Sequence, residues 1–368
     1  MGSNTVSYSI LGYNFTIITN SSKLMVNQIS HISQFSYSKP TEERASNTSI
    51  VIKYIEDKNL FSETKERILS AEGGQILLTF EKEYHFKVTI ESDIYFMQIP
   101  DKYIVIKKNN QLFVVIADGV KDTTKYVFRL IREILVRLQE NSGKIFMHAT
   151  SIITNNYGIA ILGNAGSGKT TYFSKLLSVG HASIISNDRT FFYFDQKPMM
   201  DYFPIPVVYK IGAVNNNANL RHHIIESGNY SLPDAFMKGE KSYPIPLTDV
   251  PSFFNDTDFC ETANLDLIIF SKIDFDNPYY FDANFLSNDE AVQLMKETCF
   301  TPTDRESLRT VWIYPRLKSD IKLEADADNL IKKIVGAVPT VYVRFGKDIS
   351  SNEIYTKTMQ LLEGKNEC

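Results

Sequence analysis

Three features of the amino-acid sequence predict an α/β P-loop domain preceded by a β-rich N-terminal domain. Up to about residue 120 the chain is divided into short runs rich in Ile, Val, Phe and Tyr, separated by polar turns, which is typical of strands. Beyond an amphipathic segment at 123–140, candidate strands and helices alternate, which is typical of a layered α/β domain. This second part also contains a glycine-rich phosphate-loop motif at 163–170. We therefore predict a β-rich domain at 1–120 and a P-loop domain at 121–368 that begins with a connecting helix.

The predicted strands of the first domain include the runs 49–55, 75–80, 94–99 and 111–116. Their β-branched and aromatic content favours an antiparallel sheet or a small barrel. No cluster of side chains suited to catalysis stands out among them. The edge or groove of such a sheet would suit an extended peptide, so this domain is a candidate substrate-binding domain.

The second domain opens with the segment 123–140, whose broad apolar face and charged opposite face predict a helix. After it we expect strands at 145–154, 158–162, 182–186, 265–270 and 340–345, and helices at 170–178, 325–335 and 352–362. The stretch 195–259 is rich in Pro, Asn and Tyr, and we expect it to consist largely of loops.

The composition of the chain excludes several classes of protein. With 368 residues, 43% of them hydrophobic, the chain is long enough for two packed cores. Its net charge of −4 and lack of a long Lys/Arg run argue against a nucleic-acid partner. No apolar run approaches the ~18 residues of a membrane span. The cysteines at 260, 299 and 368 are too far apart for a CxxC metal motif, and their low number is typical of a cytoplasmic protein.

The phosphate-loop motif matches the pattern G-x-x-x-x-G-K-[ST] at every fixed position. It comprises Gly163, Asn164, Ala165, Gly166, Ser167, Gly168, Lys169 and Thr170. An apolar strand precedes it and a helix-forming segment that starts at Thr171 follows it, which is the expected context. Glycines let backbone N–H groups turn inward toward phosphate oxygens, and the N-terminus of the helix adds positive potential. These residues and Thr171 are therefore predicted to bind a nucleoside triphosphate, with Lys169 at the β- and γ-phosphates and Thr170 as a Mg²⁺ ligand.

A carboxylate follows the next predicted strand, where Asn187 and Asp188 come directly after the run 182–186. A carboxylate at the carboxyl end of a strand that neighbours the phosphate loop is where a Mg²⁺ partner is expected. Asp188 lies only about 19 residues after Lys169, whereas in most GTPases and motor ATPases the acidic residue lies much further along the chain.

In this short spacing the sequence resembles the catalytic domain of the HPr kinase/phosphorylase family, whose relatives include the serine kinases of lasso-peptide clusters. The resemblance covers residues 146 to about 194, with Met147-His148-Ala149 opening one strand and Ser186-Asn187-Asp188 ending another; 337–345 is similar to a late strand of the family. It implies a fold like that of phosphoenolpyruvate carboxykinase. It also implies ATP- and Mg²⁺-dependent transfer to a Ser or Thr hydroxyl of a peptide or small protein, with His148 near the γ-phosphate or Asp188.

The sequence departs from the family pattern at Asn187, because the family has an aspartate there that contacts the attacking hydroxyl. An amide can orient a hydroxyl but cannot take its proton. The candidate catalytic residues are therefore Asp188, Asn187, Lys169 and His148, and the candidate Mg²⁺ ligands are Thr170 and Asp188. Three explanations stay open: the register of the resemblance is shifted by one residue, Asp188 serves both the metal and the hydroxyl, or the chain binds a nucleotide without transferring its phosphate.

Two other functions stay open at this point: a kinase for a small molecule such as a free amino acid or an alcohol, and a nucleotide-binding module without catalysis, which Asn187 favours. Ser271-Lys272-Ile273-Asp274 resembles the [NT]-K-x-D guanine reader of GTPases except at its first residue, so the choice between ATP and GTP is also open. The sequence leaves the oligomeric state undecided, a homo-oligomer included.

Overall fold

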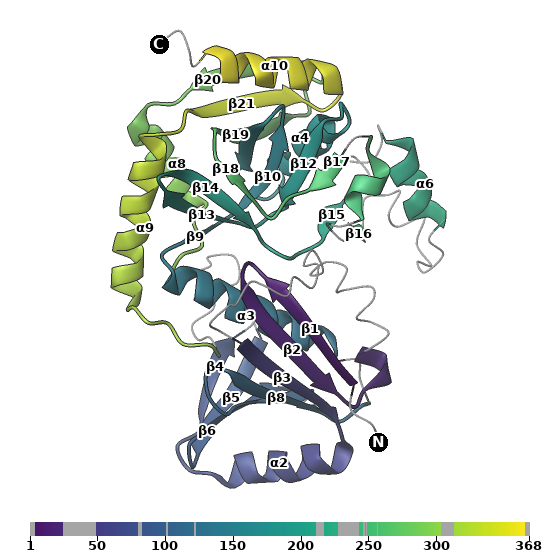
Figure 1. Cartoon of the computed structure of the whole chain (residues 1–368), viewed down its shortest axis with the longest axis vertical. Helices are drawn as coiled ribbons and strands as arrows, with labels where there is room; N and C mark the ends of the chain where they lie inside the picture. Colours follow the sequence, from purple (N-terminus) through teal and green to yellow (C-terminus); the bar gives the residue numbers. More distant parts are fainter. Residues whose placement is uncertain are drawn as a thin grey trace. The chain divides into compact units, whose positions relative to one another are not determined.

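The structure is a computed structural model that describes residues 4–24, 49–79, 83–100, 102–120, 123–210, 217–226, 243–245, 247, 249–255, 257–302 and 313–364. The chain divides into two compact units, one made of Met1–Ser142 with Pro302–Asp320 and the other of Gly143–Thr301 with Ile321–Cys368. The boundary therefore lies after Ser142 and not at 120, because the helix at the boundary packs within the first unit. The mixed α/β character expected from the sequence is present (Figure 1).

The first unit is built on an eight-stranded sheet. Its order is β1 (Asn4–Ile10), β2 (Tyr13–Thr19), β3 (Ser49–Glu56), β8 (Leu112–Ala117), β7 (Tyr103–Lys107), β6 (Asp93–Ile99), β5 (Glu83–Ile90) and β4 (Gln75–Thr79). The expectation of an antiparallel sheet was wrong for β3, which pairs in parallel with both β2 and β8. Strand periodicity reports which face of a strand is buried and carries no information on the direction of its partners.

Two helices belong to this unit. Helix α3 (Lys125–Asn141) confirms the helix expected at 123–140. Helix α2 (Lys58–Ser70) was not expected; Asp57 caps it by accepting hydrogen bonds from the backbone N–H groups of Asn59 and Leu60, and Phe61 and Ile68 pack into a cluster with the sheet.

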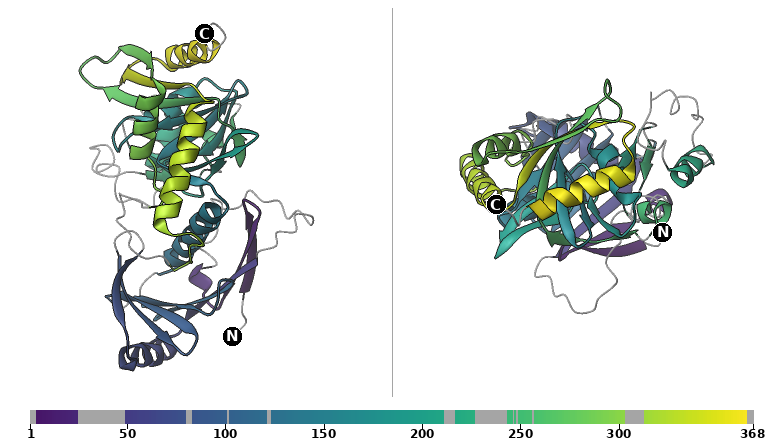
Figure 2. Two further views of the ribbon diagram at one scale, coloured as in Figure 1. Left: turned by 90° about the vertical axis from the view of Figure 1, so that its left-hand side faces the viewer. Right: turned by 90° about the horizontal axis from the view of Figure 1, so that it is seen from above.

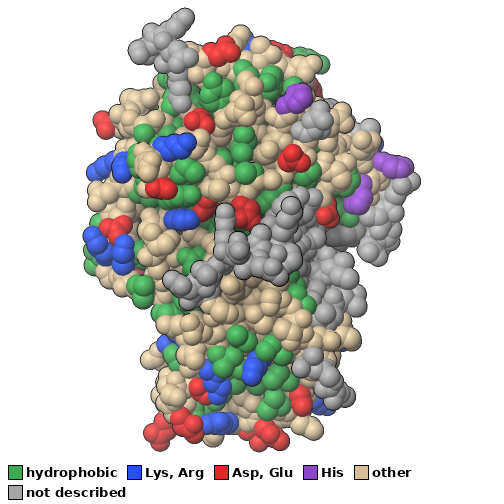
Figure 3. All heavy atoms as spheres, viewed as in Figure 1, with side chains coloured by type: hydrophobic (Ala, Val, Ile, Leu, Met, Phe, Trp, Pro, Cys, Tyr) green, Lys and Arg blue, Asp and Glu red, His purple; other side chains and the backbone are tan. Residues whose placement is uncertain are grey.

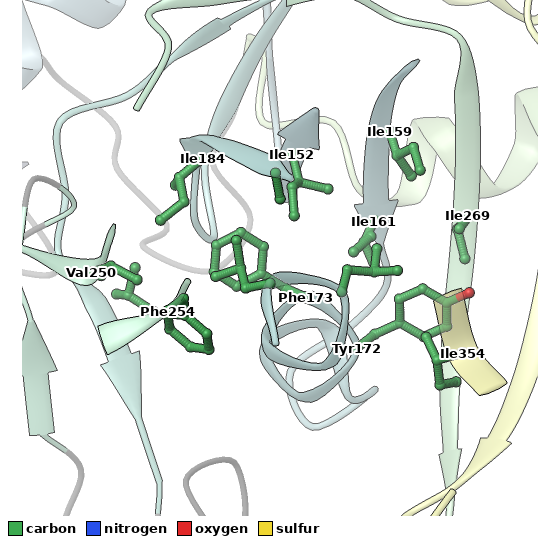
Figure 4. Close-up of a cluster of buried hydrophobic side chains, with 14 of the residues drawn as sticks. Ile152, Ile159, Ile161, Tyr172, Phe173, Ile184, Val250, Phe254, Ile269 and Ile354 are labelled. Atoms are coloured by element: carbon green, nitrogen blue, oxygen red, sulfur yellow. The ribbon is translucent and has the colours of Figure 1, made fainter. Parts of the chain in front are cut away.

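The second unit contains a seven-stranded mixed sheet in the order β17 (Thr257–Phe259), β12 (Ala182–Ser186), β10 (Ala149–Thr154), β11 (Tyr157–Leu162), β19 (Leu267–Asp274), β21 (Thr340–Gly346) and β20 (Phe281–Phe285). Helices α4 (Lys169–Leu177) and α10 (Ser351–Glu363) pack on one face of it. In Figure 4, Phe173 of α4 lies toward Ile152 and Ile184 of the sheet, whereas Tyr172 lies toward Ile354 of α10. This apolar packing holds the start of α4 at the edge of the sheet.

Two further helices and two small sheets complete the unit. Helices α8 (Asn288–Glu297) and α9 (Asp320–Val335) lie side by side and are joined by an ion pair between Lys296 and Asp328 (Figures 1 and 2). A four-stranded sheet has the order β18 (Thr262–Asn264), β14 (Lys197–Tyr202), β13 (Thr190–Asp195) and β9 (Ile145–Met147), and a two-stranded sheet joins β15 (Val207–Tyr209) to β16 (Tyr243–Ile245).

The expected strands and helices near the C-terminus are confirmed as β19, β21, α9 and α10, but two expectations were wrong. The strand expected at 145–154 is two strands, β9 and β10, which belong to different sheets and meet at His148. The stretch 195–259 contains β14, β15, β16, β17, helix α6 (Ala218–Glu226) and the short helix η1 (Val250–Phe253). Pro198, Pro244 and Pro251 lie inside β14, β16 and η1, so proline in this stretch does not by itself indicate a loop; 211–216 and 227–242 lie outside the described residues.

None of the helices in the described ranges has the length and apolar content needed to cross a bilayer. On the face of the molecule in Figure 3, Lys and Arg side chains are interspersed with Asp and Glu side chains. The absence of nucleic-acid and membrane partners, the cytoplasmic location and the oligomeric state remain predictions.

Candidate active site

Strand pairing brings three separate segments to one edge of the seven-stranded sheet. Strand β10 lies antiparallel between β11 and β12, with Ala149 opposite Leu162 and Ser151 opposite Ser186. The start of β10 therefore lies beside the ends of β11 and β12. The residue before β10 is His148, the residues after β11 form the glycine-rich loop, and the residues after β12 are Asn187 and Asp188.

The glycine-rich loop connects β11 to α4 through backbone that requires glycine at three positions. Gly163, Gly166 and Gly168 have φ values of 139°, 81° and 95°. A Cβ atom on Gly168 would lie 2.9 Å from the Cβ atom of Ile273 and 2.9 Å from Cζ of Phe345. The turn and the close approach to β19 and β21 both exclude a side chain, so Gly168 can start α4 only as glycine.

Lys169 lies within the loop, with 7% of its surface exposed. Its Nζ donates to the carbonyl oxygens of Gly163 at 2.6 Å and Asn164 at 3.3 Å. The backbone N–H of Ile273 in turn donates to the carbonyl of Ser167 at 2.9 Å, which ties the loop to β19. The loop and its cation thus form one ordered unit at the start of α4.

Asp188 provides a carboxylate at the same edge of the seven-stranded sheet as the glycine-rich loop. Its Oδ1 accepts from Nε2 of His148 at 2.9 Å and its Oδ2 accepts from Nη1 of Arg189 at 2.7 Å. Partial burial alone would raise the pKa of Asp188. The hydrogen bond from His148 and the charge of Arg189, with smaller effects of the His148 and Lys169 charges, outweigh burial and lower this pKa to about 2. The carboxylate is therefore ionised at neutral pH, and its side chain is 42% exposed.

Asn187 points away from the solvent. It is 2% exposed, and its Oδ1 accepts from Oγ1 of Thr150 at 3.2 Å. The same Oγ1 atom accepts from the backbone N–H of Asp188 at 3.2 Å, where the backbone has a φ of 64°. Thr150 of β10 therefore holds the turn after β12 in a left-handed conformation that residues other than glycine seldom adopt.

Phe300 supports the two side chains that bind Asp188. The imidazole of His148 stacks on its ring, with centroids 5.3 Å apart and planes at 26°, and Cζ of Arg189 lies 4.2 Å from the ring centroid. The backbone N–H of His148 also donates to the carbonyl of Thr298 at 2.8 Å. The segment after α8 thereby fixes the orientation of the His148 and Arg189 side chains, which both bind Asp188.

Of the residues predicted from the sequence, the structure brings His148, Lys169 and Asp188 together, and it places Thr170 and Thr171, both half-buried, on the first turn of α4. Sequence reasoning missed Thr150, Arg189 and Phe300. Arg189 could have been predicted as the counter-ion of Asp188, because it is the next residue in the sequence. Thr150 and Phe300 reach the site only through strand pairing and carry no local signal.

The residues predicted for Mg²⁺ fit the ion by their chemistry. Mg²⁺ binds oxygen atoms, and in nucleotide sites most of its ligands are phosphate oxygens and water rather than protein side chains. The ionised carboxylate of Asp188 and the hydroxyl of Thr170 at the start of α4 are ligands of this kind. Among the described residues, no three His, Cys, Asp or Glu side chains cluster as a metal site of their own. Asp188 and Thr170 would therefore complete a site whose remaining ligands come from the nucleotide and water.

The [NT]-K-x-D-like run 271–274 is not arranged as a base reader. Asp274 is 4% exposed, and its Oδ1 accepts from the backbone N–H groups of Asp276 and Asn277. Its Oδ2 accepts from Nδ2 of Asn277 and pairs with Nη2 of Arg344 at 2.6 Å. This carboxylate holds the turn between β19 and β20, and guanine recognition through it is disfavoured.

No protein-family model and no curated protein matches the chain. Among solved structures, it is similar to one described as the Hpr(Ser) kinase/phosphatase from Coxiella burnetii, with 10% sequence identity and a TM-score of 0.26. That match covers 60% of this chain and 95% of the other. At this identity and TM-score the likeness does not identify the family of the chain.

Proposed function

We propose that this protein binds a Mg²⁺-nucleoside triphosphate at the loop of residues 163–170 and transfers its γ-phosphate to a hydroxyl group. The observation that supports this proposal most directly is the meeting of Lys169 and Asp188 at one sheet edge. Strand pairing brings the loop after β11 and Asp188 after β12 to either side of the start of β10, and the loop holds Lys169 through two of its carbonyl oxygens. Phosphoryl transfer depends mainly on positioning and on stabilising charge, which is what such an arrangement provides.

The roles in the proposed reaction follow from the contacts. Backbone N–H groups of the loop and the ammonium of Lys169 bind the phosphates. Asp188 accepts a hydrogen bond from the attacking hydroxyl and orients its oxygen toward phosphorus, while His148 and Arg189 keep the carboxylate ionised and fixed. Thr170 and Asp188 would hold Mg²⁺, which would supply positive charge that neutralises the phosphates.

Asn187 has a supporting role in this proposal. Because its side chain is buried against Thr150, it positions the turn that carries Asp188 and does not contact the acceptor. In this proposal Asp188 is therefore the one carboxylate that contacts the attacking hydroxyl. Its pKa of about 2 makes it a weak proton acceptor. The hydroxyl proton therefore leaves late, to a phosphate oxygen or to Asp188, and turnover is slow.

The acceptor we propose is a Ser or Thr hydroxyl of a peptide or small protein, with ATP as the donor, as the resemblance in the sequence implies. A kinase for a free amino acid or alcohol is the second candidate. The third candidate is a nucleotide-binding module that transfers no phosphate. The burial of Asn187 favours it, because Asp188 is then the one acidic side chain available to the hydroxyl and its low pKa makes it a weak base.

Calorimetry with Mg·ATP tests the binding step. Lys169→Ala should abolish tight binding, because the loop loses its ammonium, while Lys357→Ala on the exposed face of α10 should bind as wild type. A folded Lys169→Ala protein with unchanged affinity would exclude the phosphate-loop assignment. Labelled ATP offered with Ser- and Thr-containing peptides, or with free serine and threonine, then separates the three functions. Tight binding without transfer to any of them supports the non-catalytic module.

A further inference from the structure

A cleft of about 280 Å³ opens beside the phosphate loop, within the second unit. Residues 163–167 of the loop form one wall. The rest of the lining includes Phe270 and Lys272 of β19, Leu294 and Glu297 of α8, and Tyr342 of β21. The lining also includes Thr298, whose carbonyl accepts from the backbone N–H of His148, but not His148, Lys169 or Asp188 themselves.

In the strand order, the part of the cleft formed by β19 and β21 lies on the other side of the loop from Asp188. In the order β12-β10-β11-β19-β21, the loop follows β11, Asp188 and His148 lie at β12 and β10, and the cleft lies at β19 and β21. A nucleoside triphosphate is a linear ligand with its γ-phosphate at one end and its nucleoside at the other. With the γ-phosphate directed at Asp188, the nucleoside end is directed toward β19 and β21.

The chemistry of the cleft matches an uncharged group with an aromatic face. Lys272 and Glu297 bring opposite formal charges, and Leu294 and Tyr342 bring apolar surface, so the lining does not select for a second anion. Tyr342 remains 37% exposed although its strand is paired on both sides, by β19 and β20. An exposed aromatic ring in a paired strand offers a stacking surface for a base.

We propose that this cleft binds the nucleoside of the triphosphate, with Tyr342 stacked on the base and Glu297 accepting hydrogen bonds from nucleoside hydroxyl or amino groups. Gln293 donates to Oε1 of Glu297 at 3.1 Å and holds this carboxylate at the rim of the cleft. The proposal rests on the proposed function, since it takes the loop as the phosphate site.

The experiment compares Mg·ATP with Mg·tripolyphosphate, which has the same phosphate chain and no nucleoside, by calorimetry on the full chain. Wild type should bind ATP more tightly. Tyr342→Ala should weaken ATP about tenfold, the size expected for loss of an aromatic stacking partner, and leave tripolyphosphate unchanged. Tyr342→Phe keeps the ring and should bind both ligands as wild type. Tyr279→Ala removes a 74% exposed tyrosine outside the cleft and should change neither affinity.

The outcomes separate this proposal from the loop assignment. If Tyr342→Ala binds ATP as wild type while Lys169→Ala loses both ligands, the cleft does not hold the nucleoside and the loop assignment stands. If Tyr342→Ala weakens both ligands equally, Tyr342 acts on the loop and the proposal is overturned. If Tyr342→Ala changes only the KM of the acceptor, the cleft is an acceptor site. If wild type binds neither ligand, the proposed function and the cleft proposal both fail.

Discussion

Thr150→Val tests the hydrogen bonds that hold the turn of Asp188. The hydroxyl of Thr150 donates to Oδ1 of Asn187 and accepts from the backbone N–H of Asp188, both at 3.2 Å, and the residue is 1% exposed. Valine has the same shape and also suits a strand, so the substitution removes little besides these two bonds. A buried polar group left without its partner costs about 1–3 kcal/mol. Because both bonds are long, we expect a total loss of about 2 kcal/mol in the free energy of unfolding.

The same strand provides a matched control. Thr154 is fully buried in β10, and its Oγ1 has no hydrogen-bond partner among the described residues. Thr154→Val makes the same chemical change and removes a buried hydroxyl that forms no such bond, so it should be neutral or stabilising. The difference between the two variants isolates the bonds of Thr150 from the general effect of replacing Thr by Val.

Urea denaturation of both variants, followed through the transition of the second unit, measures this difference. A folded Thr150→Val protein should also transfer phosphate more slowly than wild type while it binds Mg·ATP with similar affinity, because the position of Asp188 is no longer fixed. Equal stabilities of Thr150→Val and Thr154→Val, within about 0.5 kcal/mol, would show that the Thr150 bonds do not hold the turn.

Three further predictions concern the loop and its carboxylate. Gly168→Ala should destabilise the protein by about 1–3 kcal/mol in urea denaturation, because alanine disfavours a φ of 95° and its Cβ atom meets two side chains at 2.9 Å; Gly364→Ala, with open space around it, should not. In a Mg²⁺ titration of the transfer rate, Asp188→Asn should lose more activity than Thr170→Val, since it removes a charge as well as a ligand; near-full turnover of Asp188→Asn would contradict its role. The pKa of Asp188 is lowered from 3.8 to about 2, so its ionised form adds stability above pH 4 that is lost as the pH falls toward 2. The stability difference between wild type and Asp188→Asn should shrink over that interval, and a constant difference would contradict the shift.

The residues of the site that could be predicted from the sequence are those whose signal is local. The motif at 163–170 prescribes its own turn, because glycine alone tolerates the backbone there and the lysine follows at a fixed spacing. Asp188 was recognisable as the first carboxylate after an apolar strand. The strands β11, β12, β19 and β21 were likewise predicted from apolar runs within one segment.

The features that were missed depend on pairing between distant segments. The break between β9 and β10 at His148 arises because β9 pairs with β13 while β10 pairs with β11 and β12. The run 145–154 contains no Gly, Pro, Asn or Asp that would indicate a turn there. Phe300 reaches the site because its backbone N–H bonds to the carbonyl of Phe146, more than a hundred residues earlier in the chain. Helix α8 was also missed, although Ser287 and Glu290 form a capping box that is visible in the sequence.

Asn187→Asp distinguishes a residue that faces the acceptor from one that supports the turn. In the structure an aspartate at 187 would be buried against Thr150, next in the chain to the ionised Asp188. Burial and the neighbouring negative charge both raise the pKa of such a carboxyl group. The folded variant would therefore hold its proton more tightly than the unfolded chain. Its stability should fall below that of wild type as the pH rises above about 3.9, by about 1.4 kcal/mol for each unit of pKa difference.

Two measurements on Asn187→Asp follow from this reasoning. Urea midpoints at pH 4 and pH 8 should show a gap from wild type that widens with pH, and single-turnover transfer should be no faster than wild type. If position 187 reached the acceptor, a carboxylate there would act as a general base and raise the rate by about 10²–10⁴-fold. A faster variant whose stability gap does not change with pH would place the side chain in the solvent beside the nucleotide. The hydrogen bond from Thr150 would then not be what holds position 187, and Asp188 would share its role with this residue.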